Sequence, residues 1–209
     1  GGEIPLAAAI ERGLKEGACQ AAARQLETRE PLDVIHQEMI PALDRVGKGF
    51  EKGTIFLPQL LMSAEAAKAA FAVIREKLEA GGQTQEKKGK IVLATVKGDI
   101  HDIGKNIVKV LLENYSYQVL DLGRDVPPEK VVETALNEGA PLVGLSALMT
   151  TTVPSMEETI RQLRDKAPAV RVMVGGAVLT EEYAKTIGAD AYCRDAMASV
   201  NYAEQGFGE

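Results

Sequence analysis

The chain has 209 residues, of which 45% are hydrophobic, and it carries a formal net charge of -6 at pH 7. This length accommodates one or two domains with a substantial core. The acidic balance argues against a nucleic-acid-binding surface. No apolar run reaches the length of a membrane span, and no charged leader precedes an apolar segment at the start, so we expect a cytoplasmic protein without a membrane partner.

The first part of the chain, residues 1–80, carries helical periodicity without strand alternation. We predict helices over residues 4–15, 18–28, 31–53 and 57–80, the third with a kink at Pro41 and ended by its glycines. Four helices with short turns form a small bundle domain. His36 lies within the third helix, and it is interpreted as a solvated or packed residue because no metal-type residue recurs four positions later.

The stretch 81–89 is polar, glycine-rich and without periodicity, so it is predicted to be a linker. Beyond it, residues 90–209 alternate between strand and helix patterns. Strands are predicted at 91–95, 118–122, 142–146, 170–174 and 189–192. A helix is expected after each strand, the third from about Ser155. Five such units predict an α/β domain with a doubly wound, flavodoxin-like (Rossmann-like) parallel sheet.

Two cysteines lie far apart in the sequence, at Cys19 and Cys193. Their positions do not form the close spacing typical of a metal site. We therefore expect free thiols in a reducing compartment rather than a disulfide.

The loop after the first strand reads Val-Lys-Gly-Asp-Ile-His-Asp-Ile-Gly-Lys-Asn-Ile-Val and contains Asp99, His101 and Gly104. Loops at the carboxyl ends of parallel strands are where such sheets bind ligands. A histidine there can offer one ring nitrogen to a metal while the other donates to a carboxylate. Alternatively, Asp99 and Asp102 cap the next helix. A phosphate-binding loop is disfavoured because Gly104-Lys105 lacks the required flanking residues.

Two further motifs follow at the ends of later strands: Ser146-Ala147-Leu148 and Gly175-Gly176. The hydroxyls after the third strand could simply cap a helix, and the paired glycines could form an ordinary turn. The order and intervals of D-x-H-x-x-G, S-x-L and G-G, however, resemble the cobalamin-binding domain. That domain is shared by methionine synthase, the corrinoid proteins of methyltransferase systems and some carbon-skeleton mutases.

The resemblance implies a cofactor and its binding residues. The cofactor would be cobalamin or a related corrinoid, methylcobalamin in the loaded state, bound base-off with His101 as the lower axial ligand of cobalt. Asp99 and Thr152 would complete a hydrogen-bonded series with His101; methionine synthase has serine where this chain has Thr152. The remaining matched residues would bind the nucleotide tail or let backbone approach it: Gly104, Ser146, Leu148, Gly175 and Gly176.

The end of the third predicted helix and the start of the fourth resemble the helical cap beside the cobalamin domain in these proteins. By that resemblance, apolar side chains would cover the upper face of the corrin: Phe50, Phe56, Leu57 and Leu60. Aromatic residues at a corner between helices are also common in a helical core, and that interpretation stays open. The linker would then serve as a hinge for cap movement.

A cap followed by a cobalamin domain is the layout of free-standing corrinoid proteins. The resemblance implies a methyl carrier, not catalytic alone, between a substrate-specific methyltransferase and an acceptor methyltransferase that acts on a thiol or tetrahydrofolate. A reductive activase would be a third partner. Alternatives are a fragment of methionine synthase, a cobalamin-dependent sensor, or a plain flavodoxin-like or receiver domain.

Overall fold

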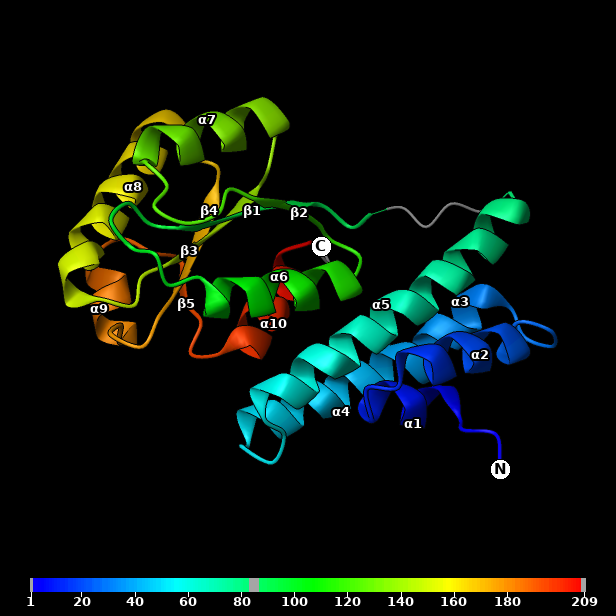
Figure 1. The fold of residues 1–209 in the computed structure, drawn as a ribbon. Helices are drawn as coiled ribbons and strands as arrows, with labels where there is room; N and C mark the ends of the chain where they lie inside the picture. The colour runs from blue at the N-terminus through cyan, green and yellow to red at the C-terminus, as the bar shows by residue number, and fades with distance from the viewer. Residues whose placement is uncertain (1, 83–86, 208–209) are drawn as a thin grey trace. The chain divides into compact units, whose positions relative to one another are not determined.

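The computed structural model describes residues 2–82 and 87–207 (Figure 1). The chain forms two compact units, residues 1–86 and 87–209, and each is described here by itself. The boundary between the units falls within the stretch 81–89 that was predicted as a linker. Residues 83–86 of that stretch lie outside the described residues.

The first unit is helical. Its helices are α1 (Leu6–Glu11), α2 (Lys15–Gln25), α3 (Pro31–Val34), α4 (Ile40–Glu51) and α5 (Leu57–Ala80), with a π-helical turn η1 (Ile35–Met39) between α3 and α4. The helical bundle predicted from the periodicity is confirmed. Large apolar side chains fill its core: Leu6, Ile10, Leu43, Leu60, Ile74 and Leu78.

The third predicted helix contains a π-helical turn directly before Pro41. In this turn the Ile40 N–H donates to the Ile35 carbonyl, one residue farther back than in an α-helix. Proline has no N–H to donate, and its ring collides with the carbonyl four residues earlier in a regular helix. A wider turn before the proline relieves this collision. The predicted kink is therefore a local change in helical pitch, and the helix continues through Gly49 to residue 51.

Helix α5 differs from the expectation that no segment is long and apolar enough to span a membrane. It has 24 residues, and its most apolar 18-residue window has a mean hydropathy of 1.2, with 39% of that window buried. Leucine, isoleucine, valine and alanine side chains together produce this value. Leu60, Ala64, Ala67 and Ile74 recur on one face, which packs on α2. The core helix of a helical bundle can have the same length and hydropathy. The buried face of α5 is consistent with that role.

The second unit contains one five-stranded parallel sheet. Its strands are β1 (Lys90–Thr95), β2 (Gln118–Asp121), β3 (Leu142–Ser146), β4 (Arg171–Gly175) and β5 (Ala191–Tyr192), in the order β2-β1-β3-β4-β5. The predicted doubly wound sheet is thus confirmed. Register aligns Thr95 with Ser146 and Ser146 with Gly175, which brings the ends of β1, β3 and β4 together.

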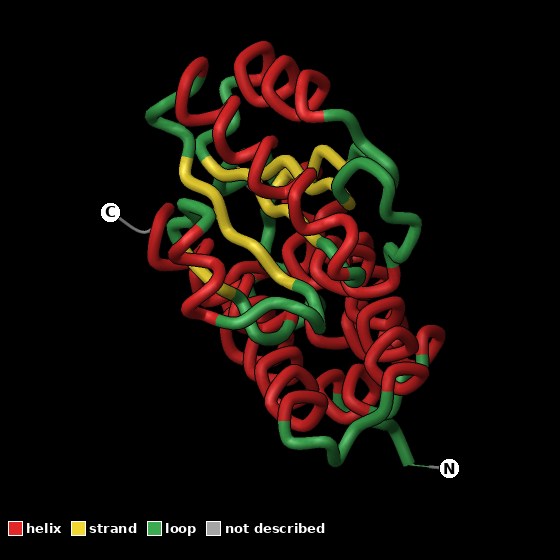
Figure 2. Tube along the Cα trace, turned by 90° about the vertical axis from the view of Figure 1, so that its left-hand side faces the viewer, coloured by secondary structure: helices red, strands yellow, loops and turns green. Residues whose placement is uncertain are grey.

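Helices cover both faces of this sheet. They are α6 (Ile103–Asn114), α7 (Pro128–Glu138), α8 (Val153–Lys166), α9 (Glu181–Thr186) and α10 (Ala196–Phe207). Helices α7 and α8 pack on one face, and α6 and α10 on the other (Figure 1). Figure 2 shows the strands in yellow with helices in red on either side. Helix α8 begins two residues before the predicted Ser155 because a 3₁₀ turn, η2 (Thr150–Thr152), leads into it.

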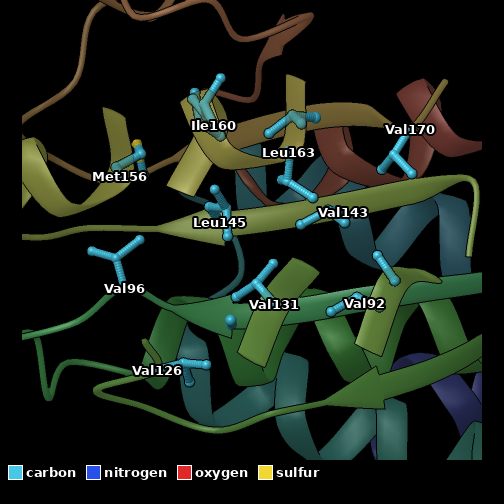
Figure 3. Packing of buried hydrophobic residues seen from close by; sticks show 14 of the residues in the cluster. Val92, Val96, Val126, Val131, Val143, Leu145, Met156, Ile160, Leu163 and Val170 are labelled. Atoms are coloured by element: carbon cyan, nitrogen blue, oxygen red, sulfur yellow. The ribbon is translucent and has the colours of Figure 1, made fainter. Parts of the chain in front are cut away.

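Alternate residues of each strand face opposite helix layers, as a pleated strand requires. Val92, Val143 and Leu145 belong to the core cluster that includes Val131 of α7 and Ile160 of α8 (Figure 3). Gly144, between two of these residues, faces the other layer. A Cβ at Gly144 would lie 2.6 Å from Leu93 and 3.0 Å from Met173. Of the two free cysteines, Cys193 is buried and Cys19 half-buried.

An ion pair ties the start of α6 to the end of β2. The Nζ atom of Lys105, which is 4% exposed, lies 2.6 Å from Asp121 Oδ1. Burial alone would raise the pKa of the Asp121 carboxyl, but hydrogen bonds from Lys105 and the Gly123 N–H, with the charge of Lys109, lower it below its ordinary value. Asp121 therefore stabilises the fold at pH values at which its carboxyl is ionised. This stabilisation is lost as pH falls through the lowered pKa.

We predict that Asp121→Asn destabilises the second unit by about 3 kcal/mol at pH 7, because it leaves the Lys105 charge buried without its carboxylate. The difference in the free energy of unfolding between this variant and the wild type should become smaller only as pH falls below about 4. Urea unfolding followed by tyrosine fluorescence measures this unit, since all five tyrosines lie at residue 115 or later. Glu133→Gln, an exposed carboxylate on α7, is the control. Equal losses at pH 7 and pH 3.5 would contradict the ion-pair account.

Candidate functional site

The candidate site lies where β1 and β3 run side by side and their following helices diverge. Helix α6 leaves β1 toward one face of the sheet, and α8 leaves β3 toward the other (Figure 1). Doubly wound sheets bind ligands at such a switch point, outside the carboxyl ends of the strands. The loop after β1 carries Asp99 and His101, and the loop after β3 carries Leu148 and Thr152.

Asp99 is fully buried and joins these two loops through its carboxylate. Its Oδ1 atom accepts a hydrogen bond from the His101 backbone N–H at 3.0 Å. Its Oδ2 atom accepts from the Leu148 N–H at 2.8 Å, the Met149 N–H at 3.4 Å and the Thr152 hydroxyl at 2.7 Å. The carboxylate therefore connects backbone segments that are about fifty positions apart in the sequence.

These donors keep the buried carboxyl ionised. Burial by itself raises the pKa of the Asp99 carboxyl, since the charged form loses its hydration. Hydrogen bonds from the backbone N–H groups of His101 and Leu148, and from the side chains of Thr152 and His101, outweigh burial and hold the pKa well below its ordinary value. Asp99 thus presents a fixed negative charge to the ring of His101.

His101 is held by this charge on one side only. Its Nδ1 atom lies 2.8 Å from Asp99 Oδ1, and its side chain is 45% exposed. A neutral imidazole that donates from Nδ1 has an unshared electron pair at Nε2. Within residues 2–82 and 87–207, Nε2 has no hydrogen-bond partner. This is the arrangement in which a histidine can bind a metal.

The capping alternative for these aspartates does not describe the structure. Helix α6 begins after Asp102, whose side chain makes no capping hydrogen bond, and the Asp99 carboxylate is turned toward the loop after β3. The Thr152 hydroxyl does not cap helix α8 and instead takes part in the site. Its Oγ1 atom lies near both Asp99 Oδ2 and the Met149 carbonyl. The three residues predicted to form a series, His101, Asp99 and Thr152, are therefore in hydrogen-bonding contact.

The paired glycines at the end of β4 are required by the protein's own backbone. Gly176 has φ +144°, and a Cβ there would lie 1.8 Å from the Ala147 carbonyl oxygen. A Cβ at Gly175 would lie 3.2 Å from the Cys193 carbonyl oxygen. These glycines were expected to let the backbone approach a cofactor tail. In the structure they let the loops after β3, β4 and β5 approach one another. This packing brings Ser146 and Gly175 to the same edge of the sheet.

Comparison with known proteins identifies the family of the chain. Residues 89–201 match the B12 binding domain family, and residues 5–75 match a second family that is also described as a B12 binding domain. A dimethylamine corrinoid protein of Methanosarcina mazei is 39% identical over 96% of this chain and 93% of its own length. The chain belongs to the corrinoid proteins. A corrinoid protein of Desulfitobacterium hafniense is 38% identical over 88% of this chain and 86% of its own length.

Solved structures share the fold of this corrinoid protein. The crystal structure of the methanol:cobalamin methyltransferase complex of Methanosarcina barkeri contains a chain with a TM-score of 0.82 and 30% identity, over 98% of this chain and 78% of that chain. A cobalamin-binding protein of Desulfitobacterium hafniense has a TM-score of 0.80 and 27% identity, over 96% of each chain. The family assignment replaces the interpretation as a plain flavodoxin-like or receiver domain.

The surroundings of His101 fit a corrinoid. A Cβ at Gly104, in the first turn of α6, would meet nothing within 4 Å, so no neighbouring residue requires glycine there. Two apolar side chains near the histidine are exposed, Ile100 at 61% and Leu148 at 41%. Open space, exposed apolar groups and an imidazole nitrogen without a partner together suit a large, mostly apolar macrocycle that contains a metal.

The apolar residues that were predicted to cover a corrin belong to the helical unit. Phe56 is 69% exposed at the start of α5, and Phe50 and Leu57 are half-buried. Leu60 is 1% exposed on the face that it shares with Ala64, which makes it a core residue of the bundle. The core interpretation therefore applies to Leu60, while the role of the other three stays a prediction. His36 is exposed in η1, consistent with a solvated residue.

Sequence reasoning did not identify three residues that support the site. Thr95 is fully buried, and its hydroxyl lies 3.0 Å from the Ser146 hydroxyl. Asp125 hydrogen-bonds the loop that carries Asp99. Ile100 had a sequence signal, because it is an apolar residue between two polar ones. Thr95 and Asp125 could not be identified from the sequence, because their roles depend on contacts between different βα units.

We predict that Gly176→Ala destabilises the second unit by about 3 kcal/mol, because the methyl group would overlap the Ala147 carbonyl. Gly139→Ala is a matched control: Gly139 has φ +62° but open space around its Cβ position, so only conformational strain of about 1 kcal/mol is expected. Urea unfolding followed by tyrosine fluorescence compares the two. Equal effects would show that the contact between the loops after β3 and β4 is unimportant.

Proposed function

We propose that this corrinoid protein is a methyl carrier that binds cobalamin or a related corrinoid base-off, with His101 as the lower axial ligand of cobalt. When bound, the corrinoid supplies a cobalt atom that accepts a methyl group from one partner and gives it to another. The observation that carries the proposal is the geometry of His101. Its Nδ1 atom faces the buried carboxylate of Asp99, and its Nε2 atom is left without a partner in the described chain.

In this proposal Asp99 fixes the tautomer and direction of the imidazole. The ionised carboxylate accepts a hydrogen bond from the Nδ1–H group, which leaves the electron pair on Nε2 for cobalt. The same contact would keep the ring in place whether or not a metal is bound, because Asp99 is buried and fixed by its own hydrogen bonds. Thr152 supports this arrangement because its hydroxyl donates to the other carboxylate oxygen of Asp99.

The end of the sheet would hold the nucleotide tail of the cofactor. Ser146, with its hydroxyl beside that of Thr95, can offer a hydrogen bond at the point where β1 and β3 end. Leu148 and the backbone at Gly175 and Gly176 would line the same slot. With the cofactor's own base held in this slot, His101 would be the residue that holds the metal.

The helical unit would shield the reactive face of the cofactor. Phe50, Phe56 and Leu57 are the candidates, since each retains exposed surface for contact. In the carrier role this unit moves aside when a partner's active site approaches, with the linker as hinge. The linker residues 83–86 lie outside the described residues.

We further propose a substrate-specific methyltransferase, an acceptor methyltransferase for a thiol or tetrahydrofolate, and a reductive activase as partners in the cytoplasm. The M. barkeri complex supports the first partner, because a chain in that methyltransferase assembly resembles this one. Similarity to dimethylamine corrinoid proteins over nearly their whole length favours a methylamine as the methyl donor. It also favours a carrier over a methionine synthase fragment or a sensor. Methyl-transfer assays with candidate partner enzymes test the donor and acceptor.

We predict that His101→Gly leaves a folded protein that still binds cobalamin but lacks histidine ligation. The visible spectrum of the bound hydroxocobalamin should therefore change. His36→Gln is the matched control because His36 is the other of the two histidines and lies in the helical unit, and its spectrum should equal that of the wild type. A His101→Gly spectrum identical to the wild-type spectrum would refute the ligand assignment.

We predict opposite effects of Gly104→Ala on the free and the loaded protein. Without cofactor, alanine should stabilise α6 by about 0.5 kcal/mol, because its Cβ meets open space. With cofactor, the methyl group should lower the affinity for cobalamin about tenfold, or ~1.4 kcal/mol. Unfolding of the apo-protein and spectral titration with hydroxocobalamin measure the two effects. Unchanged affinity would mean that no ligand approaches Gly104.

A further inference from the structure

The loop that carries Asp99 and His101 is supported from behind by the segment between β2 and α7, residues 122–127. Val96 and Val126 form a parallel bridge beyond the ends of the strands. The Thr95 N–H donates to the Gly123 carbonyl at 2.9 Å, and the Val126 N–H donates to the Thr95 carbonyl at 3.1 Å. These bonds continue the pairing of the sheet up to the point where the loop turns toward the site.

Asp125 extends this support into the loop itself through two hydrogen bonds. Its backbone N–H donates to the Asp99 carbonyl at 2.9 Å. Its Oδ1 atom accepts from the Gly98 N–H at 2.7 Å. Asp125 therefore binds two backbone groups of the loop, the N–H of Gly98 and the carbonyl of Asp99. These two groups flank the peptide bond that joins Gly98 to Asp99.

The backbone conformation of Asp125 in this contact is unusual for a residue other than glycine. Asp125 has φ +53°, and among the described residues only Ser116 is another non-glycine residue with positive φ. Gly98 has φ +86°. Aspartate tolerates the left-handed region better than most residues but still at some cost. The two hydrogen bonds offset this cost and hold Asp125 in a conformation that a non-glycine residue rarely adopts.

The direction of the Asp99 side chain depends on the peptide that Asp125 holds. The Asp99 carboxylate must reach the N–H of Leu148 on one side and the ring of His101 on the other. A rotation of the Gly98-Asp99 peptide would move the carboxylate away from at least one of these partners. The Asp125 carboxylate is exposed and accepts its hydrogen bond from the Gly98 N–H, so it acts on the backbone of this loop.

We propose that Asp125 is a positioning residue for the metal ligand: it fixes the Gly98-Asp99 peptide so that Asp99 can orient His101 toward cobalt. The inference rests on the proposed function for its effect on the cofactor. The effect on the loop follows from the apo-protein alone. A side-chain oxygen that accepts the Gly98 N–H is the required feature, and the negative charge is not.

Two variants of the full chain separate these features. Asp125→Gly permits the positive φ but removes the acceptor, whereas Asp125→Asn retains an acceptor oxygen and also tolerates this φ. In Asp125→Gly we expect faster hydrogen exchange at the Gly98 amide, about tenfold weaker binding of hydroxocobalamin and a smaller histidine-ligated fraction in the visible spectrum. Asp125→Asn should stay within about twofold of the wild type in each measurement. Unfolding midpoints show whether either variant loses global stability.

The outcomes distinguish this inference from the proposed function. Wild-type affinity and histidine ligation in Asp125→Gly would overturn the positioning role, as would equal losses in both variants. Wild-type protein that binds cobalamin without histidine ligation would instead contradict the proposed function. In that case, hydrogen exchange at Gly98 in the apo-protein still decides whether Asp125 holds the loop: faster exchange in Asp125→Gly alone supports it, and unchanged exchange overturns it.

Discussion

The site depends on one buried charge, the carboxylate of Asp99. An ionised group without contact to water is stable only when hydrogen bonds replace its hydration. Here the donors come from its own loop and from the loop after β3, including the N–H of Leu148 and the hydroxyl of Thr152. The same bonds that stabilise the charge therefore lock together the two loops at the switch point of the sheet and leave one oxygen directed at the ring of His101.

The fold brings these groups together through register and through glycine. Parallel pairing aligns Thr95, Ser146 and Gly175 at the ends of neighbouring strands. The absence of a Cβ at Gly176 then lets the next loop approach the Ala147 carbonyl. Gly104 is different, because no neighbouring residue of the protein occupies the space beside it. The glycines of the motif thus divide into those that the backbone packing requires and one, Gly104, that the packing of the described residues does not require.

Sequence patterns were sufficient for the order of elements and the parallel sheet, because these follow from periodicity. The contacts among Asp99, His101 and Thr152 were expected only from the resemblance to the cobalamin-binding domain. Other features depend on the folded chain. The π-turn before Pro41 replaces a simple kink, and Leu60 is buried where a surface role was expected. Asp125 contacts a loop from another βα unit, and only the positive φ of its backbone marks it as unusual. Local sequence does not encode such contacts.

The central claim is that Nε2 of His101 binds cobalt while Asp99 holds Nδ1. The most direct test is electron paramagnetic resonance of cob(II)alamin bound to protein whose histidines carry ¹⁵N, since the unpaired electron couples to the axial nitrogen. The account predicts that ¹⁵N labelling converts each cobalt line from a triplet into a doublet. A triplet that persists in the labelled protein would show that the cofactor's own base still holds the metal, and would contradict the account.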